Sequence, residues 1–482
     1  NSWFNLLMRR ELTNLRKGMK SMFVVVFIAV FGSSIIGATL FGVSLNKLVL
    51  VPLEIYLLFQ NGRNLRFQVG GRQKKLISWY IVACLGSLSG ILFSVIYNTK
   101  VTDELIQRAG LQIFSYLFLL LPVALMLWNS RQEYEYAACF RKALIWTARI
   151  QTLWGIAQFA LMQTIRFDLN SIVLGGVFGG DWTRYSNIAN SSVGVVMRVT
   201  GINRDAAFLG LLLLIGFILE TKPIHKFLYV VCALLALSRV ALVSIVFIVL
   251  YQLFIKLKSR TINNKALKKS AKYGAVVIIL IIVFVRIYWQ SPALQQQIIR
   301  VLERFSTVIT GEDGTNRHIG YPIAVVQLEL FNIPLIQKFV GVGNQCGGIL
   351  MSYYSNAIQW LGLASSMLKL NYVWTVESDI ASVFLETGII GGILYYSFFY
   401  KCFRAAGIDT KKRSLVLGLA VFGVMYNMAG GSFIQLVYIS LFATDYVLTE
   451  DTKVSINGAK RNKYKRKLVY NSGELLQSEH YS

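Results

Sequence analysis

Apolar segments of membrane-spanning length recur along this chain of 482 residues. A transmembrane helix needs about 20 mainly apolar residues, and about twelve such runs alternate with polar connections. They cover residues 22–40, 45–58, 76–97, 111–128, 143–164, 206–220, 227–237, 241–254, 273–289, 380–400, 414–428 and 433–448. Only 15% of the residues are charged, against about a quarter in soluble domains. The sequence therefore predicts an all-α, polytopic membrane protein.

Thirty-four of the 49 Lys and Arg residues fall in the two terminal segments and in every second connection between these runs. Cytoplasmic loops of membrane proteins are enriched in Lys and Arg. With twelve spans, these connections and both termini are expected in the cytoplasm, including a basic tail at residues 451–482. The other connections, which carry few basic residues, are expected to face outward.

The longest outward connection, residues 290–374, contains prolines, paired glycines and aromatic residues rather than low-complexity polar sequence. Long insertions between closely spaced elements are usually functional or disordered, and this composition favours a folded extracytoplasmic loop that covers a site. The chain is then expected to divide into spans 1–9 (residues 1–289), the large loop (290–374), spans 10–12 (375–450) and the tail (451–482).

The formal net charge of +26 does not indicate a nucleic-acid partner. Basic loops that flank spans are explained by topology and by anionic lipid headgroups. The five cysteines and three histidines are scattered, so neither a disulfide nor a metal site is predicted. Nucleotide-binding and serine-hydrolase motifs are absent from the sequence. No cofactor is expected.

Four arginines lie near the outer ends of the expected spans or in the large loop. Arg198 and Arg204 precede the span at 206–220, Arg239 lies between two short spans, and Arg317 is in the loop. Ionisable residues near membrane depth are functional-site candidates, and the planar guanidinium suits phosphate. The alternative for each is an interfacial side chain or a helix-end ion pair.

Two carboxylates stand where the large loop re-enters the membrane, in the sequence V-E-S-D-I-A. Glu377 and Asp379 are too close in sequence to share a helical face. A carboxylate here can act as a general base toward a hydroxyl. The alternative is helix capping, for which Ser378 or Asp379 is suited. We expect Asp379 to cap or orient and Glu377 to act as the base.

The order of these segments resembles the O-antigen ligase and Wzy-type polysaccharide polymerase superfamily. The segments are R-x-x-G at 198–201, S-R at 238–239, R-x-x-x-Y at 317–321, G-x-G at 341–343 and the polar opening of an E-x-G-I-I-G span within 377–391. Each motif alone is short, and the resemblance depends on their order, spacing and hydropathy.

The resemblance implies a metal-independent, inverting glycosyltransferase of the GT-C type in the bacterial cytoplasmic membrane. It implies undecaprenyl-diphosphate-linked oligosaccharides as substrates at the outer face, membrane lipids as surroundings, and a chain-length regulator protein as a partner. The product would be a capsule, exopolysaccharide or O antigen. Ligases of this superfamily commonly have a histidine where this chain has V-E-S-D, so the resemblance favours a polymerase.

The resemblance also implies roles for individual residues. Glu377 takes the role of base, with His318 as the reserve candidate. Arg239 and Arg317 are expected on the diphosphate, and Arg198 on the diphosphate or the acceptor side. Further expected substrate contacts are Arg204, Asp379 and Tyr321, the last by stacking on a sugar ring. The alternatives are a ligase, a flippase or transporter of lipid-linked oligosaccharides, and a structural role in a cell-envelope complex.

Overall fold

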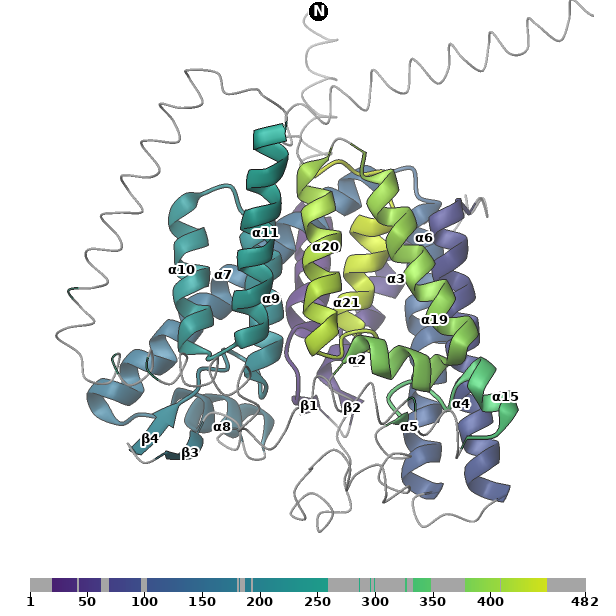
Figure 1. The fold of residues 1–482 in the computed structure, drawn as a ribbon, viewed down its shortest axis with the longest axis horizontal. Coiled ribbons are helices and arrows are strands. Elements are labelled where there is room, and N and C mark those ends of the chain that lie inside the picture. The colour runs from purple at the N-terminus through teal and green to yellow at the C-terminus, as the bar shows by residue number, and fades with distance from the viewer. Residues whose placement is uncertain are drawn as a thin grey trace, which may run out of the picture.

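The described part of the chain is a bundle of helices with two short β-hairpins (Figure 1). The structure, a computed structural model, describes residues 20–40, 43–61, 69–96, 102–179, 182, 187–191, 194–258, 333–347, 378–407 and 409–448, with single positions at 286, 295, 299 and 326. Most of the large loop, all of the span expected at 273–289 except residue 286, and the tail at 451–482 lie outside these residues.

Each apolar run that the described residues cover contains a helix, and three short helices, at residues 170–174, 175–178 and 335–340, fall outside the predicted runs. In the first half the helices are Lys20–Ser33, α2 (Leu45–Leu48), α3 (Leu50–Asn61), α4 (Gly71–Ile96), α5 (Thr102–Phe114), the π-helix η1 (Ser115–Leu120), α6 (Leu121–Trp128), α7 (Glu133–Ile165), η2 (Asn170–Leu174) and α8 (Gly175–Phe178). In the second half they are α9 (Ala206–Leu219), α10 (Pro223–Leu235), α11 (Arg239–Lys258), α15 (Leu335–Val340), α19 (Asp379–Ala405), α20 (Thr410–Met425), α21 (Ser432–Val437) and η3 (Tyr438–Phe442).

Each hairpin is a two-stranded antiparallel sheet. Strands β1 (Thr39–Leu40) and β2 (Val43–Ser44) follow the first helix, and β3 (Asn187–Ser191) and β4 (Gly194–Met197) precede α9. Both lie at the lower end of the bundle in Figure 1.

Three helical segments of the described chain are long and apolar enough to cross a membrane: Gly71–Ile96, Leu105–Trp128 and Asp379–Ala405. Shorter apolar helices accompany them at Lys20–Ser33, Ala206–Leu219, Pro223–Leu235, Arg239–Ile255 and Ser432–Phe442. The expected all-α membrane character is therefore supported at this level.

Aromatic side chains fill the centre of the bundle. Trp79 and Tyr80 of α4 pack against Tyr116 of η1, with ring centroids 5.8 and 5.0 Å apart. Tyr395 of α19 packs on Trp79 at 5.1 Å and on Tyr438 of η3 at 6.2 Å. Rings of this size make many dispersion contacts, so they hold α4, η1, α19 and η3 together.

Polar contacts define the two ends of the bundle. At one end, Arg72 of α4 donates to the carbonyl oxygen of Phe442 at 3.0 Å, and Lys412 of α20 donates to that of Thr444 at 2.7 Å. We call this the basic end. At the other end, Tyr426 donates to Asp205 at 2.6 Å. We call this the site end, and it contains the starts of α9, α11 and α19 and the end of α20.

Candidate functional site

The first two motifs of the sequence meet at the site end. The Nε atom of Arg198 donates to the carbonyl oxygen of Ala236 at 3.1 Å, and the N–H of Val199 donates to that of Leu235 at 3.2 Å. Ala236 lies three residues before Arg239. The R-x-x-G segment therefore lies beside the residues that lead into the S-R segment, and Arg198 and Arg239 are each only partly exposed.

The turn that carries Arg239 is tight. Leu237, just before it, has φ +50°, a left-handed conformation that is uncommon for a large side chain. Ser238 packs against α9, because a Cβ on Gly210 would lie 2.2 Å from its Oγ atom. These contacts fix where α11 begins, and with it the position of Arg239.

A buried network of amide side chains holds the R-x-x-G segment. Gln151 of α7 accepts from the N–H of Ile202 at 2.7 Å, and Gln158 accepts from the N–H of Thr200 at 3.2 Å. Asn170 donates to the carbonyl oxygen of Gly201 at 2.8 Å. Buried polar groups that are paired in this way rigidify a structure. The backbone after Arg198 is thus fixed from α7 and η2.

Arg204 has local partners. Its guanidinium lies 4.8 Å from the ring centroid of Trp182, and its Nη2 atom donates to the carbonyl oxygen of Gly179 at 3.4 Å. A cation over an indole face is an attractive contact. Arg204 therefore joins the R-x-x-G segment to the loop after α8, and its expected contact with substrate stays a prediction.

Asp379 opens α19 as a buried acceptor. Its Oδ1 atom accepts from the N–H groups of Met428 and Ala429 at 2.6 and 2.9 Å. Its Oδ2 atom accepts from the hydroxyl of Tyr395 at 3.1 Å. Ser378 occupies the N-cap position of α19 without a side-chain capping bond. Asp379 thus orients the segment before α21 rather than capping its own helix.

The connection after α20 joins the two halves of the site end. Tyr426 donates to Asp205, the N-cap of α9, at 2.6 Å. The next residue, Asn427, donates to Ser382 of α19 at 2.7 Å. The arginine-bearing segment before α9 and the carboxylate-bearing start of α19 are therefore held at the same end by two neighbouring residues.

Helix α19 is broken at Gly388, which has φ +65° and ψ −176°. The break leaves the carbonyl oxygens of Leu385 and Glu386 to accept from the N–H groups of Val342 and Gly343 at 3.1 and 3.0 Å. Carbonyl groups freed inside a membrane protein need such partners. The G-x-G motif thus pairs with the break in α19.

Close backbone packing explains the glycines of this junction. A Cβ on Gly86 of α4 would lie 2.4 Å from the carbonyl oxygen of Val340, and one on Gly90 would lie 2.0 Å from that of Val342. One on Gly341 would lie 2.2 Å from the carbonyl oxygen of Glu386. Small residues allow backbones within membranes to approach closely. The G-x-G segment is therefore fitted between α4 and α19.

Glu386 is a second carboxylate of α19, and it was not among the predicted site residues. It is buried and lies seven residues after Asp379, about two helical turns, so both are on one face of the first part of α19. A Cβ on Gly347 would lie 3.2 Å from its Oε1 atom. An ionisable residue inside an apolar run is a functional-site candidate, and this signal was present in the sequence.

Four of the predicted residues, Glu377, Arg317, His318 and Tyr321, lie outside the described residues. Glu377 is covalently joined to Ser378, whose backbone carbonyl accepts from the N–H of Ser382 at 2.8 Å. The described part of the chain contains no group of three or more His, Cys, Asp or Glu residues placed to hold a metal ion.

Comparisons with known proteins do not assign the chain to a family. No protein-family model matches the chain, and no curated protein matches it.

Proposed function

We propose that this protein is a membrane-embedded polymerase that joins lipid-diphosphate-linked oligosaccharide repeats into a cell-surface polysaccharide. The observation that carries the proposal is the grouping of Arg198 and Arg239 at the end of the bundle where α19 begins with Asp379. These segments are far apart in sequence, and their order resembles the polymerase superfamily. Cations for a diphosphate and carboxylates for a hydroxyl are the two chemical requirements of the reaction.

The proposed topology has twelve crossings in the bacterial cytoplasmic membrane. The long helices of the described residues run in alternating directions between the basic end and the site end (Figure 1). Since α11 ends at the basic end and α19 begins at the site end, the proposal includes one further crossing at residues 273–289. The positive-inside rule puts the basic end in the cytoplasm. The site end and the large loop then face outward, where lipid-linked repeats would be joined.

The proposed reaction is a single displacement at an anomeric carbon. A hydroxyl of the acceptor sugar attacks this carbon and forms the new glycosidic bond, while the bond from carbon to the donor diphosphate breaks. The hydroxyl proton goes to the carboxylate of Glu377, and the bonding electron pair leaves with the diphosphate. Attack from the face opposite to the leaving group inverts the anomeric configuration.

The arginines stabilise the charge that develops on the leaving diphosphate. Interactions that are stronger in the transition state than in the ground state accelerate the reaction. A unit charge pair at about 4 Å interacts by about 4 kcal/mol at an effective dielectric near 20. Loss of about 3 kcal/mol of this stabilisation would slow the reaction more than about 100-fold. Arg239 and Arg317 are proposed on the diphosphate, with Arg198 beside them.

A second candidate is a flippase or transporter of the same lipid-linked oligosaccharides. The break in α19 at Gly388 favours it, because discontinuous helices form the substrate sites of many transporters. The two candidates differ in whether a covalent bond forms. A transporter moves its substrate unchanged, whereas a polymerase lengthens it.

Incubation of the purified protein with its lipid-linked repeat tests the proposal. The polymerase produces a ladder of glycan lengths that differ by one repeat, together with one released lipid diphosphate per bond formed. In vesicles, a transporter would move the labelled repeat across the bilayer without changing its length. Transport without a ladder would refute the polymerase and support the second candidate.

A further inference from the structure

A basic cavity of about 770 Å³ lies at the basic end, between the start of α4 and the end of α19. Four of the residues that line it are basic, and none is acidic; they are Arg72 and Lys75 of α4 and Lys401 and Arg404 of α19. The remaining lining residues are Gly71, Ser397, Tyr400 and Ala405. The cavity is at the opposite end of the bundle from the candidate site.

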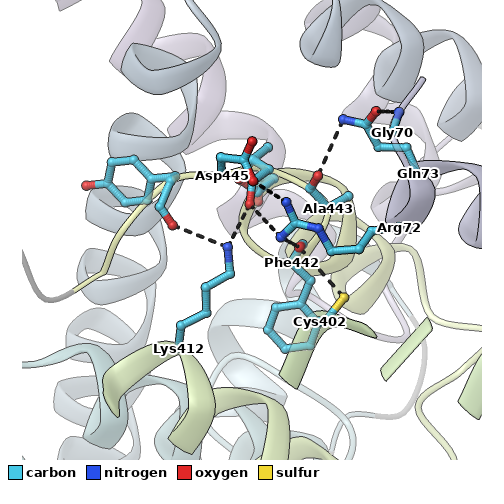
Figure 2. Close-up of polar contacts among 11 residues, drawn as sticks. Gly70, Arg72, Gln73, Cys402, Lys412, Phe442, Ala443 and Asp445 are labelled. Carbon is cyan, nitrogen blue, oxygen red and sulfur yellow. Dashed lines mark hydrogen bonds and ion pairs between the residues drawn. The ribbon is translucent and has the colours of Figure 1, made fainter. Parts of the chain in front are cut away.

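Arg72 lines this cavity, and its side chain is held in position by several contacts. Its Nη1 atom donates to the carbonyl oxygens of Phe442 and Thr444 at 3.0 and 3.1 Å, and its Nη2 atom forms an ion pair with Asp445 (Figure 2). These contacts attach the first turn of α4 to the segment after η3. The guanidinium charge is therefore held in place and partly balanced.

The other three cations are not balanced in this way. Lys75, Lys401 and Arg404 form no ion pair with a carboxylate of the described residues. Arg404 lies 5.8 Å from the ring centroid of Tyr400, and a Cβ on Gly71 would lie 3.7 Å from the Nζ atom of Lys401. Like charges around one cavity repel each other, and an anion in the cavity relieves this repulsion.

The spacing of the cations suits a phosphate group. Each helix contributes two basic residues three positions apart, which places them on one face, one turn from each other. The two helices pack side by side, so lysine and arginine donors reach the cavity from both. Arginine forms paired hydrogen bonds with phosphate oxygens, and lysine supplies a compact charge.

Exposed apolar residues continue from the cavity along α19. Tyr400 is followed toward the site end by Ile393 and Ile389, and all three are exposed. Their spacing of seven and four residues keeps them on one side of the helix. This stripe gives acyl chains a surface directly beside the basic cavity, which a free phosphate ion does not need.

We propose that the cavity lined by Lys75, Lys401 and Arg404 binds the phosphate of an anionic phospholipid, with its acyl chains along the exposed stripe of α19. Basic pockets between helices at the cytoplasmic side bind such headgroups in other membrane proteins. The bound lipid bridges α4 and α19 where Arg72 already attaches α4 to the segment after η3.

Native mass spectrometry of the full chain in detergent, titrated with phosphatidylglycerol or phosphatidylcholine, tests this site. The test variant is Lys75→Gln/Lys401→Gln. The matched control is Lys74→Gln/Lys222→Gln, because it removes the same charge from exposed positions that do not line the cavity. Each basic residue near a lipid surface contributes about 1 kcal/mol, so phosphatidylglycerol should bind the test variant roughly 25-fold more weakly. The control should bind like the wild type.

Equal weakening in both double variants would overturn the site, because general surface charge would then explain binding. If the double variant Lys75→Gln/Lys401→Gln fails to fold, the two single variants replace it. Each should bind phosphatidylglycerol about 5-fold more weakly, and unchanged binding by both single variants would refute the proposal. A third arm uses inorganic phosphate. Competition by phosphate at concentrations similar to those of the lipid would overturn the assignment to a phospholipid, because the acyl chains would then contribute nothing.

Discussion

The guanidinium of Arg198 donates to the carbonyl oxygen of Ala236 at 3.1 Å, across 38 positions of sequence. Arg239 follows three residues later, at the first position of α11. Two short motifs therefore form one structural unit, supported by α9 and by the amide network from α7. A substitution of either arginine therefore has to be tested for its effect on folding as well as on activity.

The break in α19 predicts a strong effect at Gly388. A Cβ at this position would lie 2.3 Å from the backbone oxygen of Phe339, and the backbone conformation is one that only glycine adopts readily. Gly388→Ala should lower stability by at least about 1–3 kcal/mol. We expect a lower thermal midpoint in detergent or loss of the folded protein.

Gly110→Ala is the control for this substitution. Gly110 lies within α5, and nothing lies within 4 Å of the position of its Cβ. Alanine should leave stability unchanged or raise it by about 0.5–1 kcal/mol, because glycine weakens helix interiors. Similar thermal midpoints for both variants would contradict the close packing of the G-x-G segment against α19.

Asp379→Asn should also destabilise the protein. The carboxylate accepts from two backbone N–H groups and one hydroxyl in a buried position, and hydrogen bonds to charged groups contribute about 1.5–3 kcal/mol. The amide replaces an acceptor with a donor. The thermal midpoint should fall, and by more than for exposed Asp103→Asn in the first turn of α5, where the lost interaction with the helix dipole is about 0.3–1 kcal/mol. An unchanged midpoint for Asp379→Asn would show that these hydrogen bonds contribute little to the free energy of unfolding.

The positions of the helices followed from hydropathy, whereas their ends did not. Residues 206–220 and 380–400 were expected as spans, and the helices there are α9 (Ala206–Leu219) and α19 (Asp379–Ala405). α7 begins at Glu133, although its apolar run begins at residue 143. Charged turns extend helices beyond the apolar core, and hydropathy does not detect them.

The break in α19 and its pairing with the G-x-G motif could not be predicted, because both depend on tertiary contacts. A single glycine in an apolar sequence gives no indication of its role. The glycines at 86, 90, 341 and 388 are explained only by the close approach of neighbouring backbone segments in the folded protein. Glu386 could have been selected, since a carboxylate inside an apolar run is costly. Glu377 and Asp379 match the expected junction between loop and span more closely, whereas Glu386 lies inside the span.

The proposed topology predicts opposite labelling of the two ends. All five native cysteines are buried, so an impermeant thiol reagent should find little background in intact cells. Thr164→Cys, at the exposed end of α7, should react from outside. Lys74→Cys, at the exposed start of α4, should react only after the cells are opened. The reverse pattern would place the site end in the cytoplasm and refute the proposed reaction.

Glu377→Gln tests the proposed base. Glutamine keeps the shape of the side chain but cannot take up the hydroxyl proton as a carboxylate does. A general base contributes about 100- to 10,000-fold, so chain elongation should fall by a factor in this range while binding of the lipid-linked donor is retained. Wild-type elongation by this variant would remove Glu377 from the mechanism and direct attention to Glu386.

The most direct test of the proposed function is elongation by Arg239→Lys in the purified system, compared with Arg166→Lys. Both substitutions keep the positive charge and remove the planar fork of the guanidinium, and exposed Arg166 follows α7 at the same end of the bundle. Arg239→Lys should fold normally and lose at least about 100-fold in elongation rate, which corresponds to about 3 kcal/mol of transition-state stabilisation. Arg166→Lys should elongate like the wild type. Wild-type elongation by Arg239→Lys would contradict the diphosphate role of this arginine and the function built on it.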